Sequence, residues 1–225
     1  ARTCMTCSRF YFISISPILP TALPFLMNQE NIHPINDLLL KREDKELVLN
    51  QKGNVFWLYG LSGSGKSTLA VQLERDLQQV GIHSIVLDGD NLRDSLNKDL
   101  GFSDNDREEN IRRVSEMAKL LVSNGLLVIA SFITPRKKFR DQAKEIIGND
   151  FFHEIYIKAS FQKCESRDVK GLYAKERKGG VENLTGRKSS FEEPTNPWMT
   201  IDTEFEKQTE SSQKLFDAIL NKVKI

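Results

Sequence analysis

The chain has 225 residues, of which 39% are hydrophobic and 28% are charged. The length falls within the range of a single α/β domain. The composition is ordinary for a globular protein and excludes a disordered chain, in which core-forming residues are scarce. Thirty-two Lys and Arg against 31 Asp and Glu leave a net charge of +1, which excludes binding of polyanions through bulk positive charge. Three cysteines are too few for a disulfide framework, so we expect a reducing compartment.

The first 29 residues differ from the rest because they contain no Asp or Glu. Their apolar stretch, Phe10 to Leu26, is short for a membrane helix and is interrupted by prolines. We interpret residues 1–26 as a leader without a structural role, upstream of a start at Met27, with an organelle (plastid-type) transit peptide as the alternative. The domain is therefore predicted to span residues 27–225. Its expected location is cytoplasmic unless the leader is a genuine transit peptide.

From residue 54 onward, short apolar runs alternate with longer amphipathic stretches. The runs are Val55–Tyr59, Ile85–Leu87, Leu126–Ala130 and Ile155–Ile157. Such alternation predicts right-handed βαβ units and an α/β fold with a doubly wound, mostly parallel sheet that has helices on both faces.

The first apolar run is followed by a match to the phosphate-binding pattern GxxxxGK[ST]. The match reads Gly60-Leu61-Ser62-Gly63-Ser64-Gly65-Lys66-Ser67-Thr68, and a helical pattern follows it. Glycines let successive N–H groups turn toward phosphate oxygens at the start of a helix. The motif predicts a nucleoside-triphosphate site in which Lys66 contacts the β- and γ-phosphates and the Ser67 hydroxyl binds Mg²⁺.

The second apolar run ends in Asp88-Gly89-Asp90. Carboxylates at the C-terminal end of a parallel strand lie where ligands bind in open α/β sheets. One of them can orient Mg²⁺ or its water shell while the other faces a substrate hydroxyl. A GTPase is disfavoured because the run 97–100, Asn-Lys-Asp-Leu, does not have the spacing of a guanine-reading NKxD motif.

Two helices and a long loop are predicted in the second half of the chain. The stretch Asp106–Asn124 has a helical period, with Ile111, Val114, Ala118 and Leu121 on one stripe. The segment 168–197 is rich in Gly, Pro, Lys and Arg, which predicts a long mobile loop of functional importance. A final helix is predicted from about Thr203 to Val223, with core contacts at Phe205, Leu215, Phe216 and Ile219.

Three motifs resemble those of adenylylsulfate kinases (APS kinases). The run Leu87–Arg93 resembles LDGDN-x-R, Gly101–Arg113 resembles GFS-x-x-DR-x-ENIRR, and Lys170–Tyr173 resembles the lid motif KGLY. The resemblance extends from about Asn31 to the C-terminus. It implies a P-loop nucleotide kinase fold with a mobile lid. It also implies transfer of the γ-phosphoryl group of ATP to the 3′-hydroxyl of adenosine 5′-phosphosulfate (APS), giving 3′-phosphoadenylyl sulfate and ADP in sulfate assimilation.

The resemblance and the side-chain chemistry together predict the site. The predicted catalytic residues are Lys66, Asp88, Asp90 and Thr134, with Asp90 orienting or deprotonating the acceptor hydroxyl. The predicted substrate-binding residues are Asp90, Arg93, Phe102, Arg107, Asn110, Ile133, Lys170, Leu184 and Thr185. The two arginines would bind the anionic groups and Phe102 would stack on adenine. Lys170 would cover the nucleotides when the lid closes and excludes water. Arg113 is interpreted as part of a solvated helix face.

The sequence departs from the family pattern at three positions. Leu184 replaces an aromatic residue, which should remove a stacking contribution of ~1 kcal/mol. Thr134 replaces a serine that is assigned in the family as a phosphoryl carrier, and we expect direct in-line transfer rather than a phosphothreonine intermediate. Arg136 replaces a residue that is commonly aromatic or His.

Two alternatives stay open at this point. One is a P-loop kinase of another small hydroxylated metabolite, and the other is a non-catalytic nucleotide-binding domain. We expect no nucleic acid and no membrane as partners. A homodimer and functional coupling to an ATP sulfurylase are further hypotheses.

Overall fold

The computed structural model describes residues 33–168, 171–177, 185 and 190–225. The chain divides into two units, Ala1–Leu39 and Leu40–Ile225. The described residues of the first unit contain one 3₁₀ turn, η1 (Asn36–Leu38). The predicted leader lies outside the described residues. The second unit contains the sheet and every described residue of the predicted site.

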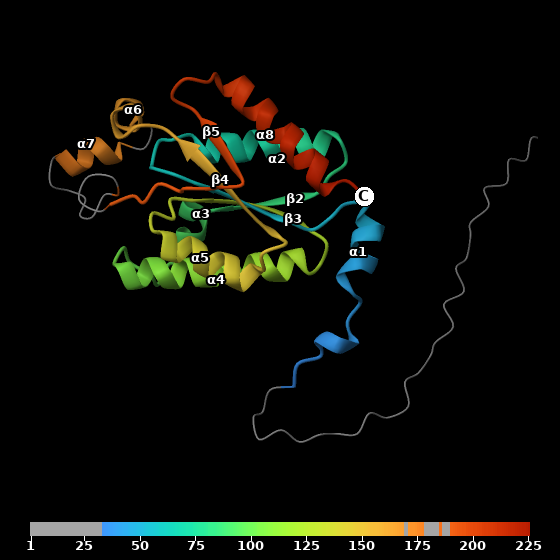
Figure 1. The fold of residues 1–225 in the computed structure, drawn as a ribbon. Coiled ribbons are helices and arrows are strands. Elements are labelled where there is room, and N and C mark those ends of the chain that lie inside the picture. Colours follow the sequence, from blue (N-terminus) through green and yellow to red (C-terminus); the bar gives the residue numbers. More distant parts are fainter. Residues whose placement is uncertain (1–32, 169–170, 178–184, 186–189) are drawn as a thin grey trace, which may run out of the picture. The chain divides into compact units, whose positions relative to one another are not determined.

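The second unit is built around a five-stranded sheet in which every paired strand is parallel (Figure 1). The strands are β1 (Val55–Tyr59), β2 (Ser84–Asp88), β3 (Leu127–Phe132), β4 (Phe152–Lys158) and β5 (Met199–Asp202), in the order β2-β3-β1-β4-β5. The predicted parallel sheet and its four apolar strands are confirmed. The fifth strand was missed because Ile201 is its one fully buried residue, so it has no apolar run.

Helices cover both faces of this sheet, as predicted (Figure 1). The described α-helices are α1 (Arg42–Leu49), α2 (Lys66–Gln79), α3 (Gly89–Asp94), α4 (Asp104–Val122), α5 (Lys137–Ile147), α6 (Phe161–Arg167), α7 (Leu172–Arg177) and α8 (Gln208–Val223). Helices α4 and α5 pack on one face, and α2 and α8 pack on the other. No helix in the described part of the chain is long and apolar enough to span a membrane.

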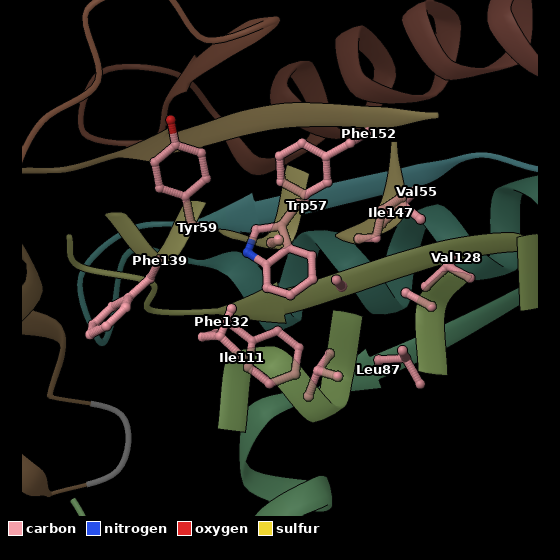
Figure 2. Packing of buried hydrophobic residues seen from close by; sticks show 14 of the residues in the cluster. Val55, Trp57, Tyr59, Leu87, Ile111, Val128, Phe132, Phe139, Ile147 and Phe152 are labelled. Atoms are coloured by element: carbon pink, nitrogen blue, oxygen red, sulfur yellow. The ribbon is translucent and has the colours of Figure 1, made fainter. Parts of the chain in front are cut away.

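The central strand β1 contributes alternate side chains to two cores. Val55, Trp57 and Tyr59 face α4 and α5, and Figure 2 shows their packing with Phe132, Phe139 and Phe152. Phe56 and Leu58 face α2 and α8. All five side chains of β1 are fully buried, as expected for a parallel strand covered on both faces. This burial fixes the strand that leads into the phosphate loop.

The final helix is shorter than predicted, and one of its expected core contacts is wrong. It begins at Gln208 rather than Thr203, and Phe205 is 84% exposed. The residues before it are held in other ways: the Thr203 N–H donates to the Lys158 carbonyl at 3.0 Å, which continues the pairing of β5 with β4. Leu215 and Ile219 are buried and Phe216 packs against them, as predicted.

The predicted loop 168–197 is not wholly irregular. Its described part contains α7, in which the carboxylate of Asp168 accepts hydrogen bonds from the N–H groups of Tyr173 (3.0 Å) and Ala174 (2.9 Å). An Asp that precedes a helix and binds its first free N–H groups is a standard start signal. Lys170 and Leu184 lie outside the described residues.

A buried histidine in β4 gives stability a predictable dependence on pH. His153 stacks on Phe56 and contacts Asn54 Oδ1 through Nε2 at 2.9 Å, and burial, with Lys222 as a smaller cause, lowers its pKa to about 4. In the unfolded chain His153 becomes protonated near pH 6.5, whereas in the folded protein it stays neutral down to about pH 4. The contribution of neutral His153 to the free energy of unfolding is therefore fully present above pH 6.5 and is lost as the pH falls toward 4. We expect the unfolding midpoint, followed by circular dichroism, to fall less over this interval in His153→Phe than in the unchanged protein. The exposed control His83→Phe should keep the full slope, and parallel curves for all three proteins would contradict the assignment.

Candidate active site

A cavity of about 990 Å³ lies at the carboxyl ends of β2 and β3 and beside the loop that follows β1. Fifteen of the predicted site residues line this cavity, and they come from several separate motifs of the sequence. They are Ser62, Gly63, Gly65, Lys66, Ser67, Thr68, Asp88, Asp90, Arg93, Phe102, Arg107, Asn110, Ile133, Thr134 and Thr185. Gly60, Leu61 and Ser64 of the phosphate loop do not line it. The fold therefore brings residues between positions 62 and 185 to one place.

The phosphate loop needs its glycines. Gly60, Gly63 and Gly65 have φ values of +150°, +81° and +100°, in the region that other residues rarely adopt. A Cβ atom on Gly60 would lie 2.3 Å from the carbonyl oxygen of Ile157 on β4. The loop therefore passes so close to the sheet that a side chain at Gly60 is excluded.

Five consecutive carbonyl groups of this loop accept hydrogen bonds from side chains. Lys66 Nζ donates to the carbonyls of Gly60 (3.0 Å) and Leu61 (2.7 Å). The three carbonyls that follow, at positions 62, 63 and 64, accept from Tyr173 Oη (2.7 Å), Arg167 Nη1 (3.2 Å) and Thr203 Oγ1 (2.7 Å). Side chains thus engage the carbonyl oxygens of the loop, while phosphate binding would use its N–H groups.

Arg167, Tyr173 and Thr203 were not predicted as site residues, although all three line the cavity. Tyr173 is the last residue of the KGLY motif, and this motif is the sequence feature that could have identified it as a site residue. Arg167 and Thr203 lie on α6 and just after β5, and nothing local in the sequence indicates their contact with the phosphate loop. Leu61, Cys164 and Tyr173 form part of a small apolar cluster, in which the cysteine is fully buried.

Three hydroxyl and carboxylate groups meet at the start of α2. Ser67 Oγ donates to Asp88 Oδ2 at 2.8 Å and lies 3.3 Å from Ser131 Oγ. The other carboxylate oxygen of Asp88 accepts from the Asp90 N–H at 3.0 Å and caps α3. The two oxygens of Asp88 therefore connect the phosphate loop helix to the helix that carries Asp90.

This oxygen set fits Mg²⁺. The ion prefers hard oxygen ligands and is usually held by one or two protein groups together with substrate phosphates and water. Ser67 and Asp88 supply a hydroxyl and a carboxylate at the phosphate loop. Within the described ranges there is no cluster of three or more His, Cys, Asp or Glu side chains that could hold a metal ion alone. The residues therefore suit a Mg²⁺ ion that arrives with a nucleotide.

Two arginines form a positively charged wall on the other side of the cavity. Arg93 Nη1 donates to the carbonyl of Gly101 at 2.7 Å, and its guanidinium carbon lies 4.5 Å from the centroid of the Phe102 ring. Arg107 donates to the carbonyl of Phe102 (3.0 Å) and to Thr185 Oγ1 (3.3 Å). Burial lowers the pKa of both guanidinium groups, and they remain charged because their ordinary pKa is so high. The wall can bind an anion by multidentate hydrogen bonds.

Asn110 on α4 lines the cavity, and a neighbouring side chain binds its amide oxygen. Asn97 Nδ2 donates to Asn110 Oδ1 at 2.9 Å, and both side chains are buried. The predicted helix 106–124 is confirmed as α4, which begins two residues earlier because Ser103 and Asp106 form a capping box. Asn97 is a supporting residue that sequence reasoning considered only as part of a guanine motif.

Arg113 lies partly exposed on α4, which agrees with its interpretation as part of a solvated helix face, and it also forms ion pairs there. It donates to both carboxylate oxygens of Asp99 at 2.8 Å and to Glu109 Oε1 at 2.8 Å. Hydrogen bonds from Arg112 and Arg113 lower the pKa of Glu109 to about 2. The pair Arg113–Asp99 ties the turn before Gly101 to α4, and so supports the arginine wall.

Thr134 has a strained backbone and an engaged hydroxyl. Its φ is +41°, which is unfavourable for a β-branched residue, and it is 2% exposed. Its Oγ1 accepts from Trp57 Nε1 at 2.9 Å, and its carbonyl accepts from Arg140 Nη1 at 3.1 Å. Strain of this kind, on the order of 1–3 kcal/mol, persists only where surrounding contacts enforce it, and it is common at active sites.

Comparison with known proteins agrees with this geometry. Residues 52–202 match the family model described as adenylylsulphate kinase. The chain is 49% identical to an adenylyl-sulfate kinase of Phocaeicola vulgatus over 86% of this chain and 95% of that protein, and 47% identical to one of Bacteroides fragilis over 86% and 96%. It also superposes on the structure of a Mycobacterium tuberculosis APS kinase in complex with AMPPNP and APS, with a TM-score of 0.71 and 42% identity over 75% of this chain and 98% of that one. The chain therefore belongs to the adenylylsulphate kinase family.

Proposed function

We propose that the cavity is where this chain catalyses the reaction of its family, transfer of the γ-phosphoryl group of ATP to the 3′-hydroxyl of APS. The observation that carries the proposal is that one cavity is lined both by the phosphate loop and by Arg93 and Arg107. A phosphate donor site therefore faces a site for an anionic acceptor. The family match disfavours the two alternatives, a kinase of another metabolite and a non-catalytic domain.

On the donor side, the loop N–H groups and Lys66 would bind the triphosphate. Lys66 Nζ now donates to two loop carbonyls and would exchange them for phosphate oxygens. Ser67, with Asp88 behind it, would hold Mg²⁺, which neutralises charge on the phosphates when it is bound. These groups of the chain would hold the donor phosphates in a fixed position.

On the acceptor side, Arg93 and Arg107 would bind the phosphosulfate, and Asn110 would donate a directional hydrogen bond. Phe102 is 62% exposed, with one ring face against Arg93, and the stacking of its ring on adenine stays a prediction. Thr185, which belongs to the predicted lid segment, accepts a hydrogen bond from Arg107. The roles of Ile133, Lys170 and Leu184 also stay predictions.

Asp90 is our candidate to orient the acceptor hydroxyl or remove its proton. It lines the cavity in the first turn of α3, and Asp88 fixes its backbone. Direct in-line transfer needs no covalent relay if donor and acceptor are held in one cavity. The engaged, buried position of the Thr134 hydroxyl supports this direct route over a phosphothreonine intermediate.

Assembly and location are also proposals. A Thiobacillus denitrificans APS kinase described as hexameric superposes with a TM-score of 0.57 and 26% identity, but the match covers 30% of that chain. We keep the homodimer, the coupling to an ATP sulfurylase and the cytoplasmic location as hypotheses.

The substrate assignment predicts a sharp contrast between two acceptors. With Mg·ATP, ADP release measured by a coupled assay should appear with APS and stay at background with 5′-AMP at equal concentration. The reason is that AMP lacks the sulfate that the arginine wall is proposed to bind. A panel of sugar acids and nucleosides serves as the second control. Phosphorylation of AMP or of a panel member at a rate comparable to APS would replace our assignment with the general metabolite kinase.

A further inference from the structure

Arg140 on α5 is a buried charge that stands behind the cavity and does not line it. It is 3% exposed, and its guanidinium carbon lies 5.0 Å from the centroid of the Tyr59 ring. Its Nε lies 3.7 Å from Glu154 Oε2, which also accepts from Tyr59 Oη at 3.1 Å. A charge removed from water is costly unless it is paired and hydrogen-bonded. Packing alone therefore does not explain a guanidinium group at this buried position.

The two terminal nitrogens of Arg140 bind two different segments. Nη1 donates to the carbonyl of Thr134 at 3.1 Å, and Nη2 donates to the carbonyl of Glu192 at 3.0 Å. Thr134 belongs to the segment after β3 that lines the cavity, and Glu192 belongs to the stretch that precedes β5. One planar guanidinium group can hold both carbonyls in a fixed relation, which the single ammonium group of a lysine cannot do.

Further bonds join the same two segments around Arg140. The Glu192 N–H donates to the carbonyl of Pro135 at 2.8 Å, and Glu192 Oε2 accepts from the Lys137 N–H at 2.6 Å. Phe191 also stacks on Tyr156, with ring centroids 5.8 Å apart. The stretch at Glu192 therefore forms a brace along the outer side of the cavity wall.

The wall that is braced contains the strained residue Thr134. Its positive φ has to be enforced by contacts, and Arg140 and Trp57 provide them from two sides, one at the carbonyl and one at the hydroxyl. If the Arg140 contact is lost, the peptide after Thr134 is free to rotate and the wall can relax. Displacements of this kind affect a reaction that needs close alignment of two substrates.

We propose that Arg140 is a positioning residue, which holds the carbonyls of Thr134 and Glu192 together and so fixes the wall segment 133–135 against the acceptor. This inference rests on the proposed function, because the acceptor is APS. It predicts a larger effect on the acceptor than on the donor, because Arg140 acts on the wall segment, whereas the donor phosphates would be bound by the loop and Lys66. The Gly60 N–H of the loop donates to the carbonyl of Ile133 in the wall at 3.3 Å, so a small effect on ATP is expected as well.

The test compares Arg140→Met, Arg140→Lys and the control Lys138→Met, an exposed cation on the same helix. For Arg140→Met we expect kcat/KM for APS to fall by about tenfold to 100-fold, with KM for ATP changed less than about twofold. Arg140→Lys should recover only part of this loss, because it restores the charge beside Glu154 but not the double carbonyl contact. Lys138→Met should behave like the unchanged protein.

Fluorescence gives a second measurement that does not depend on activity. The chain has two tryptophans, so Trp198→Phe leaves Trp57 as the single reporter beside Thr134. In this background Arg140→Met should change the Trp57 emission maximum, and Lys138→Met should leave it unchanged. If Arg140→Met does not fold, Glu192→Ala, which removes the acceptor for the Lys137 N–H, should give a smaller loss of the same acceptor-specific kind.

Three results would overturn the proposal. They are an unchanged kcat/KM for APS in folded Arg140→Met, equal losses toward ATP and APS, and full recovery by Arg140→Lys. In the case of an unfolded Arg140→Met, normal kinetics of Glu192→Ala would overturn it. A failure of the proposed function is distinct, because the unchanged protein would then release no ADP with APS.

Discussion

Asp90→Asn should lower kcat by about 10²–10⁴-fold, the usual contribution of general-base assistance. The substitution keeps the size of the side chain and some hydrogen bonding but removes the charge that favours departure of the hydroxyl proton. ATP affinity should change little, because in our proposal Lys66 and the loop N–H groups hold the donor phosphates. The measurement is steady-state ADP release with APS and ATP varied separately, together with ATP binding by calorimetry.

A matched control is available on the same short helix. Asp94 is exposed on α3 and does not line the cavity, so Asp94→Asn should leave kcat unchanged. Arg107→Ala should have a different effect: it would remove the proposed charged contact with the acceptor and mainly raise KM for APS. If Asp90→Asn instead weakened Mg·ATP binding and raised the Mg²⁺ requirement, Asp90 would belong to the metal site. An unchanged kcat would remove it from the mechanism.

Lys66→Ala should lower kcat by at least about 10²–10³-fold, the cost of removing one preorganised charged or dipolar contact to a developing anion. ATP affinity should also fall, because the ammonium group would contact the β- and γ-phosphates in both the ground state and the transition state. Single-turnover kinetics with saturating APS would separate the loss in phosphoryl transfer from the loss in binding.

The control for Lys66 lies on the same helix. Arg75 is exposed on α2, so Arg75→Ala removes a positive charge at a distance from the cavity and should keep both constants. Because Lys66 also donates to two loop carbonyls, the melting temperature of Lys66→Ala has to be measured as well. A normal rate in folded Lys66→Ala would exclude this lysine from phosphate binding.

Local patterns in the sequence predicted the parts of the molecule whose causes are local. The parallel strands, the capped helix α4 and the glycine-rich loop depend on apolar runs, a capping box and positive φ angles, and each leaves a signature within a few residues. The motifs also contain many of the side chains that line the cavity, but not Arg167 or Thr203. Residues 1–32 and part of the lid stay untested predictions, because they lie outside the described residues.

What sequence reasoning missed depends on contacts between distant segments. Asn97 supports Asn110, Arg167 and Thr203 bind the phosphate loop, and Arg140 joins two loops. None of these residues stands in a pattern of its own, and their roles arise only when the sheet order places their elements side by side. The wrong prediction of Phe205 as a core contact has the same cause. Thr203 pairs with Lys158 on β4, so α8 begins only at Gln208 and does not include Phe205.

The five engaged carbonyls of the phosphate loop have a consequence for local unfolding. Three of their donors, on Arg167, Tyr173 and Thr203, come from the last 59 residues of the chain, more than 100 positions away from the loop. A transient opening of α6 and α7 would release two of those carbonyls, and the loop would lose its shape in the same event. The nucleotide site and the α6–α7 region thus form one cooperative unit, whose amide protons should exchange with solvent at a common rate. Nucleotide binding should then slow exchange in α6 and α7 as well as in the loop it contacts.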